Sequence, residues 1–203
     1  MAKLLSGILG PVSGRIGNVV GSSWKGISYI RSYVIPGNPN TLAQQDERSQ
    51  FLSIVRLGKA ILGSVIQVFW DPFVNNNSGW AHFIGINRGL MTVYTDLSPL
   101  HLAEGTLEGD TISGATYAGS TVTFTWPGTP LGNGQATDVA VAVVYDFSHQ
   151  VAFVNTSAQR SAGTVGVNVG SGRIPAAMHA WLFFSDHATS PTVVSFSDYS
   201  AVS

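Results

Sequence analysis

The chain has 203 residues, of which 44% are hydrophobic and only 10% are charged. An average soluble domain carries about 25% charged residues, whereas a disordered chain combines high charge with few apolar residues. Disorder is therefore excluded, and because the chain has no cysteine, disulfides, thiolate metal sites and cysteine nucleophiles are excluded as well. The 23 glycines and 9 prolines indicate a turn-rich globular protein. Small polar residues, neighbouring subunits or both must cover a surface with so few charges.

Charge is unevenly distributed along the chain. Residues 1–88 carry eight basic and three acidic residues, a net charge of +5, whereas residues 89–203 carry two basic and eight acidic residues, a net charge of −6. The basic residues occur singly rather than in a run, so we do not expect nucleic acid to be a partner. Attraction between the basic part of one subunit and the acidic part of another accounts for the same pattern.

The first residues resemble a signal peptide only superficially. Their apolar stretch is short, is broken by Gly7 and Gly10, and ends at Pro11. No run approaches the roughly 18 apolar residues of a membrane-spanning helix, so we expect no membrane span. We expect a protein that is made in the cytoplasm without a signal peptide and functions in a virion or an extracellular assembly.

We predict an α+β fold in three parts, of which residues 1–37 form an extended β-ribbon arm. The arm reads as two strands, at about residues 15–21 and 26–34, around a turn at residues 22–26, because β-branched and aromatic residues alternate with glycines. A two-stranded ribbon is marginally stable in water by itself. The arm must therefore lie on its own body or on a neighbour.

Residues 38–106 are predicted to be a helical segment and linker. Thr41 and Gln44 form a capping-box pattern, after which apolar residues recur at helical spacing through about residue 69. A second helix is predicted to begin at Ser78. The two helices would form a helical hairpin whose apolar faces need a partner.

Residues 107–203 are predicted to form an immunoglobulin- or fibronectin-like β-sandwich, because about seven short strands alternate with turn residues. The predicted strands lie near residues 111–117, 121–126, 137–145, 151–155, 163–169, 178–185 and 193–199. Trp126, Tyr145 and Trp181 are the expected core aromatics, although the turn beside Trp126 also allows it to be exposed.

No sequence motif indicates catalysis. The five histidines form no HExxH or HxH pattern, and Asp186-His187 lacks a GxSxG nucleophile to complete a triad. The N-terminal glycines form no phosphate-binding loop, since no GxGxxG leads from a strand into a helix. We therefore expect no enzyme, no catalytic residue and no cofactor.

Two acidic groups deserve a test as metal or catalytic sites. They are Asp138, Asp146 and Asp186 within the predicted sandwich, and Glu104, Glu108 and Asp110 before it. The first group could meet at one end of the sandwich and hold calcium, but it lacks the DxDxDG spacing of a calcium loop. The second could serve as paired carboxylates for glycoside hydrolysis, or as solvated linker charges. We expect no metal site.

The N-terminal quarter carries a series of short motifs. The stretch SGxxGNVVGSSWKG is followed by Ile-Arg-Ser, by an Asn-Pro-x-Thr-x-x-Gln cap and by Arg-x-x-Phe. This series resembles an uncharacterised family of domain-of-unknown-function proteins associated with Bacteroidota genomes and their mobile elements. The matching residues are Met1, Ala2, Lys3, Gly14, Gly17, Trp24, Lys25, Gly26, Ile30, Arg31, Asn38, Pro39, Thr41, Gln44, Arg48 and Phe51. The resemblance implies no activity or catalytic residue, but suggests that the arm and the cap share a role across the family.

The arm carries the candidate binding residues. A tryptophan at a hairpin tip either folds back on its own helices or inserts into a partner's pocket, as interface anchors do. Arginines near it could clamp the arm internally or pair with the acidic part of the next subunit. The candidate assembly residues are Arg15, Val19, Trp24, Lys25, Ile27, Tyr29, Ile30, Arg31, Tyr33 and Arg48.

These observations favour a non-enzymatic structural protein that self-assembles head-to-tail through its arm. The product would be a virion component (a phage tail tube, capsid or cement layer) or an extracellular helical filament or tube. The partner is then the protein itself, with helical or icosahedral symmetry, together with other virion proteins. The alternative is a surface or phage adhesin whose β-sandwich binds glycans through aromatics such as Tyr117, Trp126 or Tyr199.

Overall fold

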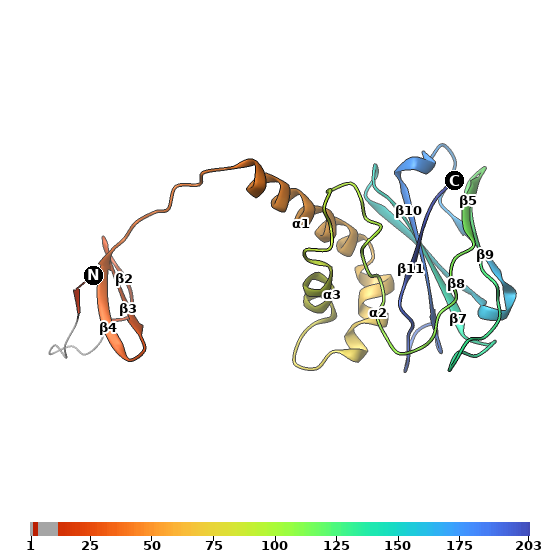
Figure 1. The fold of residues 1–203 in the computed structure, drawn as a ribbon, viewed down its shortest axis with the longest axis horizontal. Helices are drawn as coiled ribbons and strands as arrows, with labels where there is room; N and C mark the ends of the chain where they lie inside the picture. The colour runs from red at the N-terminus through yellow and green to blue at the C-terminus, as the bar shows by residue number, and fades with distance from the viewer. Residues whose placement is uncertain (1, 4–11) are drawn as a thin grey trace. The chain divides into compact units, whose positions relative to one another are not determined.

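This computed structural model describes residues 2–3 and 12–203 of the chain. The protein combines a few helices with a larger share of β-structure, which forms three antiparallel sheets. The chain divides into two compact units, Met1–Thr41 and Leu42–Ser203 (Figure 1). The mixed class of fold is as expected, whereas the division into three parts stays a prediction.

The N-terminal unit is a small antiparallel sheet in the order β1-β4-β3-β2. Its strands are β1 (Ala2–Lys3), β2 (Gly14–Ile16), β3 (Val19–Trp24) and β4 (Ile27–Ser32). The expected single strand at residues 15–21 is wrong, because a turn at Gly17-Asn18 divides it. Gly17 has φ +59°, a left-handed conformation that glycine adopts without steric cost, and Ile16 pairs with Val19 across the turn.

The second turn of this sheet is tighter than the expected five residues. Lys25 and Gly26 have φ values of +47° and +79°, as a two-residue type I′ turn requires. Trp24 therefore pairs directly with Ile27 at the end of the hairpin. After β4, residues 33–41 form neither helix nor strand.

The second unit begins with helix α1 (Leu42–Ala60), which starts directly after the predicted cap at Thr41. It is followed by a π-helical turn, η1 (Leu62–Ile66), and by α2 (Gln67–Phe69). The expectation of one helix through residue 69 is therefore wrong. The amide of Ile66 donates to the Ile61 carbonyl over 3.1 Å, a π-type bond that interrupts the regular helical ladder.

Two further elements complete the helical part. A 3₁₀ turn, η2 (Asp71–Phe73), precedes α3 (Gly79–Asn87). The Ser78 side chain accepts a hydrogen bond from the Ala81 amide over 3.2 Å, so α3 begins with the cap that the sequence predicts. Helices α1 and α3 approach closely at Gly58, where an added Cβ would lie 2.8 Å from the Trp80 ring.

Among the described residues, no single helix is long and apolar enough to cross a membrane. The segments Leu42–Ala60 and Leu62–Phe73, which are bent by 67° at their junction, meet the criteria of length and composition only as a pair.

Two sheets follow the helices, in the orders β11-β10-β7-β8 and β5-β6-β9. Their strands are β5 (Gly114–Ala118), β6 (Thr121–Thr125), β7 (Val139–Asp146), β8 (Val151–Gln159), β9 (Thr164–Asn168), β10 (Met178–Ser185) and β11 (Asp198–Ala201). Each predicted strand overlaps an observed one, but the last begins at Asp198 rather than at residue 193. Residues 193–197 are held instead by separate bonds, such as that from the Ser195 amide to the Phe184 carbonyl over 2.8 Å.

The sheet β11-β10-β7-β8 is buried on both faces at its central strands, β10 and β7 (Figure 1). Alternate residues of β7 and β10, including Val143, Tyr145 and Trp181, pack against the helices. The residues between them, including Val144 and Leu182, pack against the three-stranded sheet. This double burial explains the nearly continuous apolar runs of both strands. The expected core aromatics Trp126, Tyr145 and Trp181 are all buried.

Hydrogen bonds join the two sheets at both edges. The Tyr117 amide of β5 donates to the Ser203 carbonyl over 2.8 Å, and the Ser203 amide donates to the Ala115 carbonyl over 3.0 Å. At the other edge, Asn155 Nδ2 of β8 donates to the Gly166 carbonyl of β9 over 2.7 Å. The chain after β11 thus belongs to both sheets, whereas the immunoglobulin- or fibronectin-like topology stays a prediction.

A fully buried arginine lies near the ends of these sheets. Arg160 Nη2 is 3.2 Å from Asp138 Oδ2, Nη1 is 3.9 Å from Asp110 Oδ2, and the guanidinium lies 4.3 Å from the Phe184 ring centre. Nη2 also donates to the Glu108 carbonyl over 2.6 Å. Burial raises the pKa of Asp110, and the charge of Arg160 opposes that rise. The cluster fixes residues 108–110 to the β-structure.

Substitution of Asp138 by alanine should strongly destabilise the protein, because it leaves the buried Arg160 without its nearest carboxylate. Removal of one partner of a buried ion pair costs about 3–5 kcal/mol. Urea unfolding at pH 7 measures the loss, with Glu104→Gln as the control, since Glu104 is exposed. A loss below about 1 kcal/mol, typical of an exposed pair, would contradict this account.

Candidate functional site

The pairing of β2, β3 and β4 determines which arm residues share a face. Side chains of directly paired residues lie on the same face of an antiparallel sheet, and neighbours along a strand alternate. One face, here named the arm face, carries Arg15, Val20, Ser22, Trp24, Ile27, Tyr29, Arg31 and Tyr33. Six of the ten predicted assembly residues lie on it, and Lys25 lies in the turn at its end.

The other predicted residues are placed differently. Val19 and Ile30 lie on the opposite face of the same sheet, because their partners are Ser32 and Gly21. Arg48 belongs to α1 in the second unit. The arm face therefore unites most of the predicted set, but not these three residues.

The arm face combines aromatic rings with cationic groups. Trp24 is 68% exposed, and Lys25 Nζ lies 5.7 Å from its ring centre. The Arg15 guanidinium lies 3.6 Å from the ring centre of Tyr33, at the distance of a cation–π contact. The sequence has no acidic residue before Asp46, so the surface is uniformly basic. Tryptophan, tyrosine and arginine are the residues that most often anchor protein interfaces.

Exposed apolar residues next to this face were not predicted as part of it. Val34 and Ile35 are largely exposed in the segment after β4. They lie at the end of a predicted strand and directly precede Pro36. An apolar pair in that position was the sequence signal that could have indicated their exposure.

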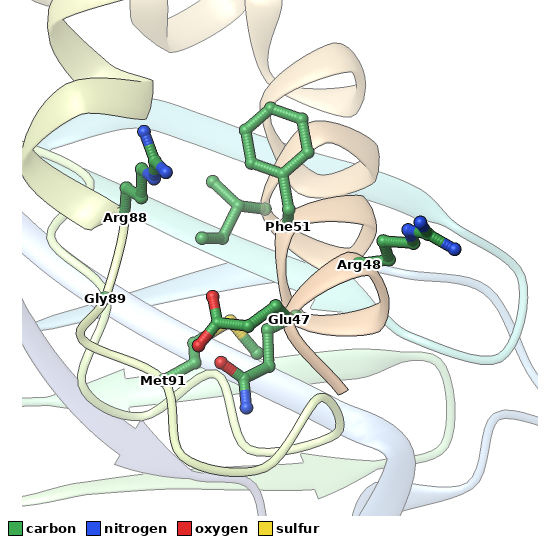
Figure 2. A pocket seen from close by; sticks show the side chains of 8 residues that line it. Glu47, Arg48, Phe51, Arg88, Gly89 and Met91 are labelled. Carbon is green, nitrogen blue, oxygen red and sulfur yellow. The ribbon is translucent and has the colours of Figure 1, made fainter. Parts of the chain in front are cut away.

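The second unit contains a pocket between α1 and the segment after α3 (Figure 2). Its volume is about 340 Å³. The lining residues are Glu47, Arg48, Gln50, Phe51, Ile54, Arg88, Gly89 and Met91. The sequence prediction includes Arg48 alone among them. The remaining residues of α1 follow helical spacing, but the segment that completes the pocket is far away in sequence.

The pocket has an apolar floor and a charged rim. Ile54 and Met91 are buried beneath it, whereas Phe51 is 46% exposed at its wall. Figure 2 shows Glu47 extending toward Met91, while Arg48 points away on the other side of the helix. Gln50 Nε2 donates to the Thr92 carbonyl over 3.0 Å and so holds the far wall against α1.

The proposed calcium group is not assembled. Asp146 pairs in register with Met178, whereas Val139, next to Asp138, pairs with Ser185, so Asp146 lies at the opposite end of the strands from the other two aspartates. Throughout residues 2–3 and 12–203, no three histidine or acidic side chains are arranged to hold a metal ion.

Asp146 instead forms a structural ion pair. Its Oδ2 lies 2.7 Å from Arg173 Nη1 and 2.7 Å from His149 Nδ1. Burial would raise the pKa of Asp146, but the hydrogen bonds from Arg173 and His149 lower it below its ordinary value. The carboxylate is therefore charged and paired at neutral pH.

Asp186 and His187 lie in a loop that the Asp186 side chain closes. Asp186 Oδ1 accepts the Thr192 amide over 2.9 Å, and its Oδ2 also accepts the Thr192 hydroxyl. Burial raises the pKa of Asp186. The hydrogen bonds from Thr192 and Val193 and the neighbouring His187 outweigh that effect and lower the pKa well below its ordinary range. The carboxylate thus closes the loop, and its Oδ2 also lies 3.0 Å from His187 Nδ1.

The acidic residues before the sheets also have separate environments. Glu104 and Glu108 are exposed, whereas Asp110 is buried beside Arg160.

The aromatics considered for glycan binding are also separated. Tyr117 packs against the cluster between the two sheets, and Tyr199 packs against the cluster on the helix side. Trp126 is in the core, where its Nε1 donates to the Arg160 carbonyl over 2.7 Å. Trp126 is thus a core residue and not an exposed platform for a sugar.

The chain is a mixed α and β protein with an exposed aromatic and basic sheet and a pocketed helical layer. A model described as a family of unknown function, DUF6266, matches residues 11–197, and the chain belongs to that family. No protein of curated function and no solved structure matches the chain. The predicted membership of an uncharacterised family is therefore confirmed, whereas its association with Bacteroidota genomes stays a prediction.

Asp146 should make stability depend on acid pH. A carboxylate whose folded pKa is lowered contributes its full stabilisation above the unfolded pKa of about 3.9 and loses it as the pH falls through the folded pKa. The Asp146→Asn variant should therefore be less stable than the parent by about 1–3 kcal/mol at pH 7. The difference should shrink below about pH 4.

Urea unfolding across this pH range measures the effect, and Arg173→Met should reproduce most of it, since Arg173 is the partner. A difference between parent and Asp146→Asn that stays constant with pH would show that the carboxylate charge contributes nothing.

Proposed function

We propose that the chain is a non-enzymatic structural subunit that self-assembles head-to-tail through its arm. The assembled product is a virion component or an extracellular filament or tube. In this proposal the protein is made in the cytoplasm and functions in that assembly. In this proposal the body consists of a helical hairpin and an immunoglobulin- or fibronectin-like β-sandwich, and the arm connects neighbouring subunits.

The observation that carries the proposal is that the arm buries no side chain among the residues whose burial is described. Among residues 12–41, only Gly21 is buried, and it has no side chain to contribute. A small sheet needs a buried apolar face to be stable. The arm face supplies such a face, and a neighbouring subunit is the proposed cover for it.

The arm face offers apolar area that a contact between subunits could bury. An aromatic side chain buries about 150–250 Å² at an interface. At about 25 cal/mol per Å², burial of Trp24 alone contributes several kcal/mol, and Tyr29 and Ile27 lie beside it on the arm face. Every subunit would give one such contact and receive one.

The connecting segment suits a contact between subunits. Residues 33–41 form no regular structure and span at most about 30 Å when extended. Since the giving and receiving surfaces differ, the contact is heterologous. Heterologous contacts produce rings, tubes or open helical polymers.

Trp24→Ala should weaken assembly by at least about tenfold, because an anchoring tryptophan contributes more than 1.4 kcal/mol to an interface. Sedimentation velocity over a range of concentrations measures the size distribution. Ile16→Ala is the matched control, since Ile16 is 66% exposed but lies on the opposite face of the sheet, paired with Val19.

Apolar association should also persist at high salt, because ions do not screen it. A parent protein that remains monomeric at micromolar concentration would overturn the proposed function. So would equal loss of assembly in the Trp24 and Ile16 variants, since the arm face would then have no special role.

A further inference from the structure

We propose that a hollow beside η2 receives the hairpin tip, Trp24 to Ile27, of a second copy of the chain. The hollow, here named the acidic hollow, has a volume of about 140 Å³ and is lined by Phe69, Trp70, Phe73, Val74, His82 and Glu104. This inference rests on the proposed function and identifies the receiving surface that head-to-tail assembly requires.

The acidic hollow has aromatic walls that are fixed by contacts within the second unit. Phe69 and Trp70 are buried, whereas Phe73 is 41% exposed at the edge. Trp70 Nε1 donates to the Leu102 carbonyl over 2.7 Å. The ring of His82 lies 5.5 Å from that of Trp70 and meets it edge-on. Because these walls are ordered before a partner arrives, binding does not have to order them.

The size of the acidic hollow fits one aromatic ring. An enclosed cavity of about 150 Å³ accommodates benzene. An open hollow of about 140 Å³ therefore has room for the six-membered ring of an indole. Trp24 is 68% exposed and lies at the end of the hairpin, where its ring can enter a concave site. Tyr29 lies farther from the turn, along the flat of the sheet.

The charge of the acidic hollow is complementary to that of the arm. Glu104 is exposed at the rim, and the described residues that line the hollow include no lysine or arginine. The tip supplies Lys25, whose Nζ lies 5.7 Å from the Trp24 ring centre. Since the sequence has no acidic residue before Asp46, the arm brings no carboxylate that Glu104 would repel. A ring with an adjacent ammonium group thus meets an aromatic wall with an adjacent carboxylate.

Two other concave sites of the second unit carry charges that oppose the tip. The pocket shown in Figure 2 has two arginines, Arg48 and Arg88, against one carboxylate, Glu47. A hollow along α1 has Arg56 and Lys59, and no carboxylate among its described lining residues. Like charges repel, so charge complementarity favours the acidic hollow over both of these sites as the receiver of a basic tip.

An exchange of charges tests the contact directly. Glu104→Lys should raise the concentration at which half of the protein is assembled by at least about tenfold, because two lysines would then face each other across the interface. Lys25→Glu should have a similar effect. The variant that carries both exchanges should assemble nearly as well as the parent, since opposite charges face each other again. Sedimentation velocity over a series of concentrations measures all four proteins.

Glu47→Lys is the matched control. It makes the same charge reversal at another exposed carboxylate, in the pocket shown in Figure 2, and should assemble like the parent. Circular dichroism and thermal unfolding establish that every variant is folded, so that loss of assembly reflects loss of the contact.

A mixture of two variants shows whether the tip enters the hollow of another copy. The tip variant, Trp24→Ala, keeps an intact acidic hollow. The hollow variant combines Phe73→Ala with Glu104→Lys, two exposed positions, and keeps an intact tip. At a concentration where each variant alone is monomeric, an equimolar mixture should give a 1:1 heterodimer at twice the monomer mass.

The outcomes separate this inference from the proposed function. If the hollow variant assembles like the parent while the tip variant does not, the receiving surface lies elsewhere, and only this inference is overturned. It is also overturned if the double exchange fails to restore assembly, if Glu47→Lys loses as much assembly as Glu104→Lys, or if no heterodimer forms. If the tip variant assembles normally, or the parent is monomeric, the proposed function fails as well.

Discussion

The pairing of β7 with β10 is the interaction on which the rest of the second unit depends. Eight residue pairs run in register from Asp146 and Met178 to Val139 and Ser185, in the middle of a sheet whose two faces are both covered. Along β7 and β10, alternate side chains pack against the helices, and the side chains between them pack against the three-stranded sheet. Ile54 of α1 belongs to the first of these clusters and is also the floor of the pocket. The pocket is therefore positioned by the core of the second unit.

Much of the fold was predictable because local physical signals agreed with the tertiary structure. The apolar runs marked β7 and β10, and capping residues marked the starts of α1 and α3. The failures have local causes. The turn at Gly17 is too short to interrupt the strand-like pattern of its neighbours, and the π turn after Ile61 preserves an apolar periodicity through the bend. Such a turn changes direction without changing composition, so periodicity alone does not show it.

The charge pattern of the sequence was less informative than it seemed. Both arginines after residue 88 are engaged internally, Arg160 with two buried aspartates and Arg173 with a third. A net charge added up along the sequence treats these aspartates as part of an acidic surface. The tertiary contacts show instead that they are paired with arginines. The arm face was more accessible to prediction, because alternation along strands follows from sequence. The assignment of Val19 and Ile30 to the other face required the register, which depends on the turns.

The two-residue turn at Lys25-Gly26 has a consequence for how this arm can vary. Its length determines the register of β4 against β3. It therefore also determines which alternate residues of β4 share a face with Trp24. A single residue inserted after Gly26 would move Tyr29 and Arg31 to the other side of the sheet while leaving Trp24 in place. The aromatic and basic surface would be divided between two faces without the loss of any side chain. Substitutions can therefore tune the surface gradually, whereas a change in turn length abolishes it in one step.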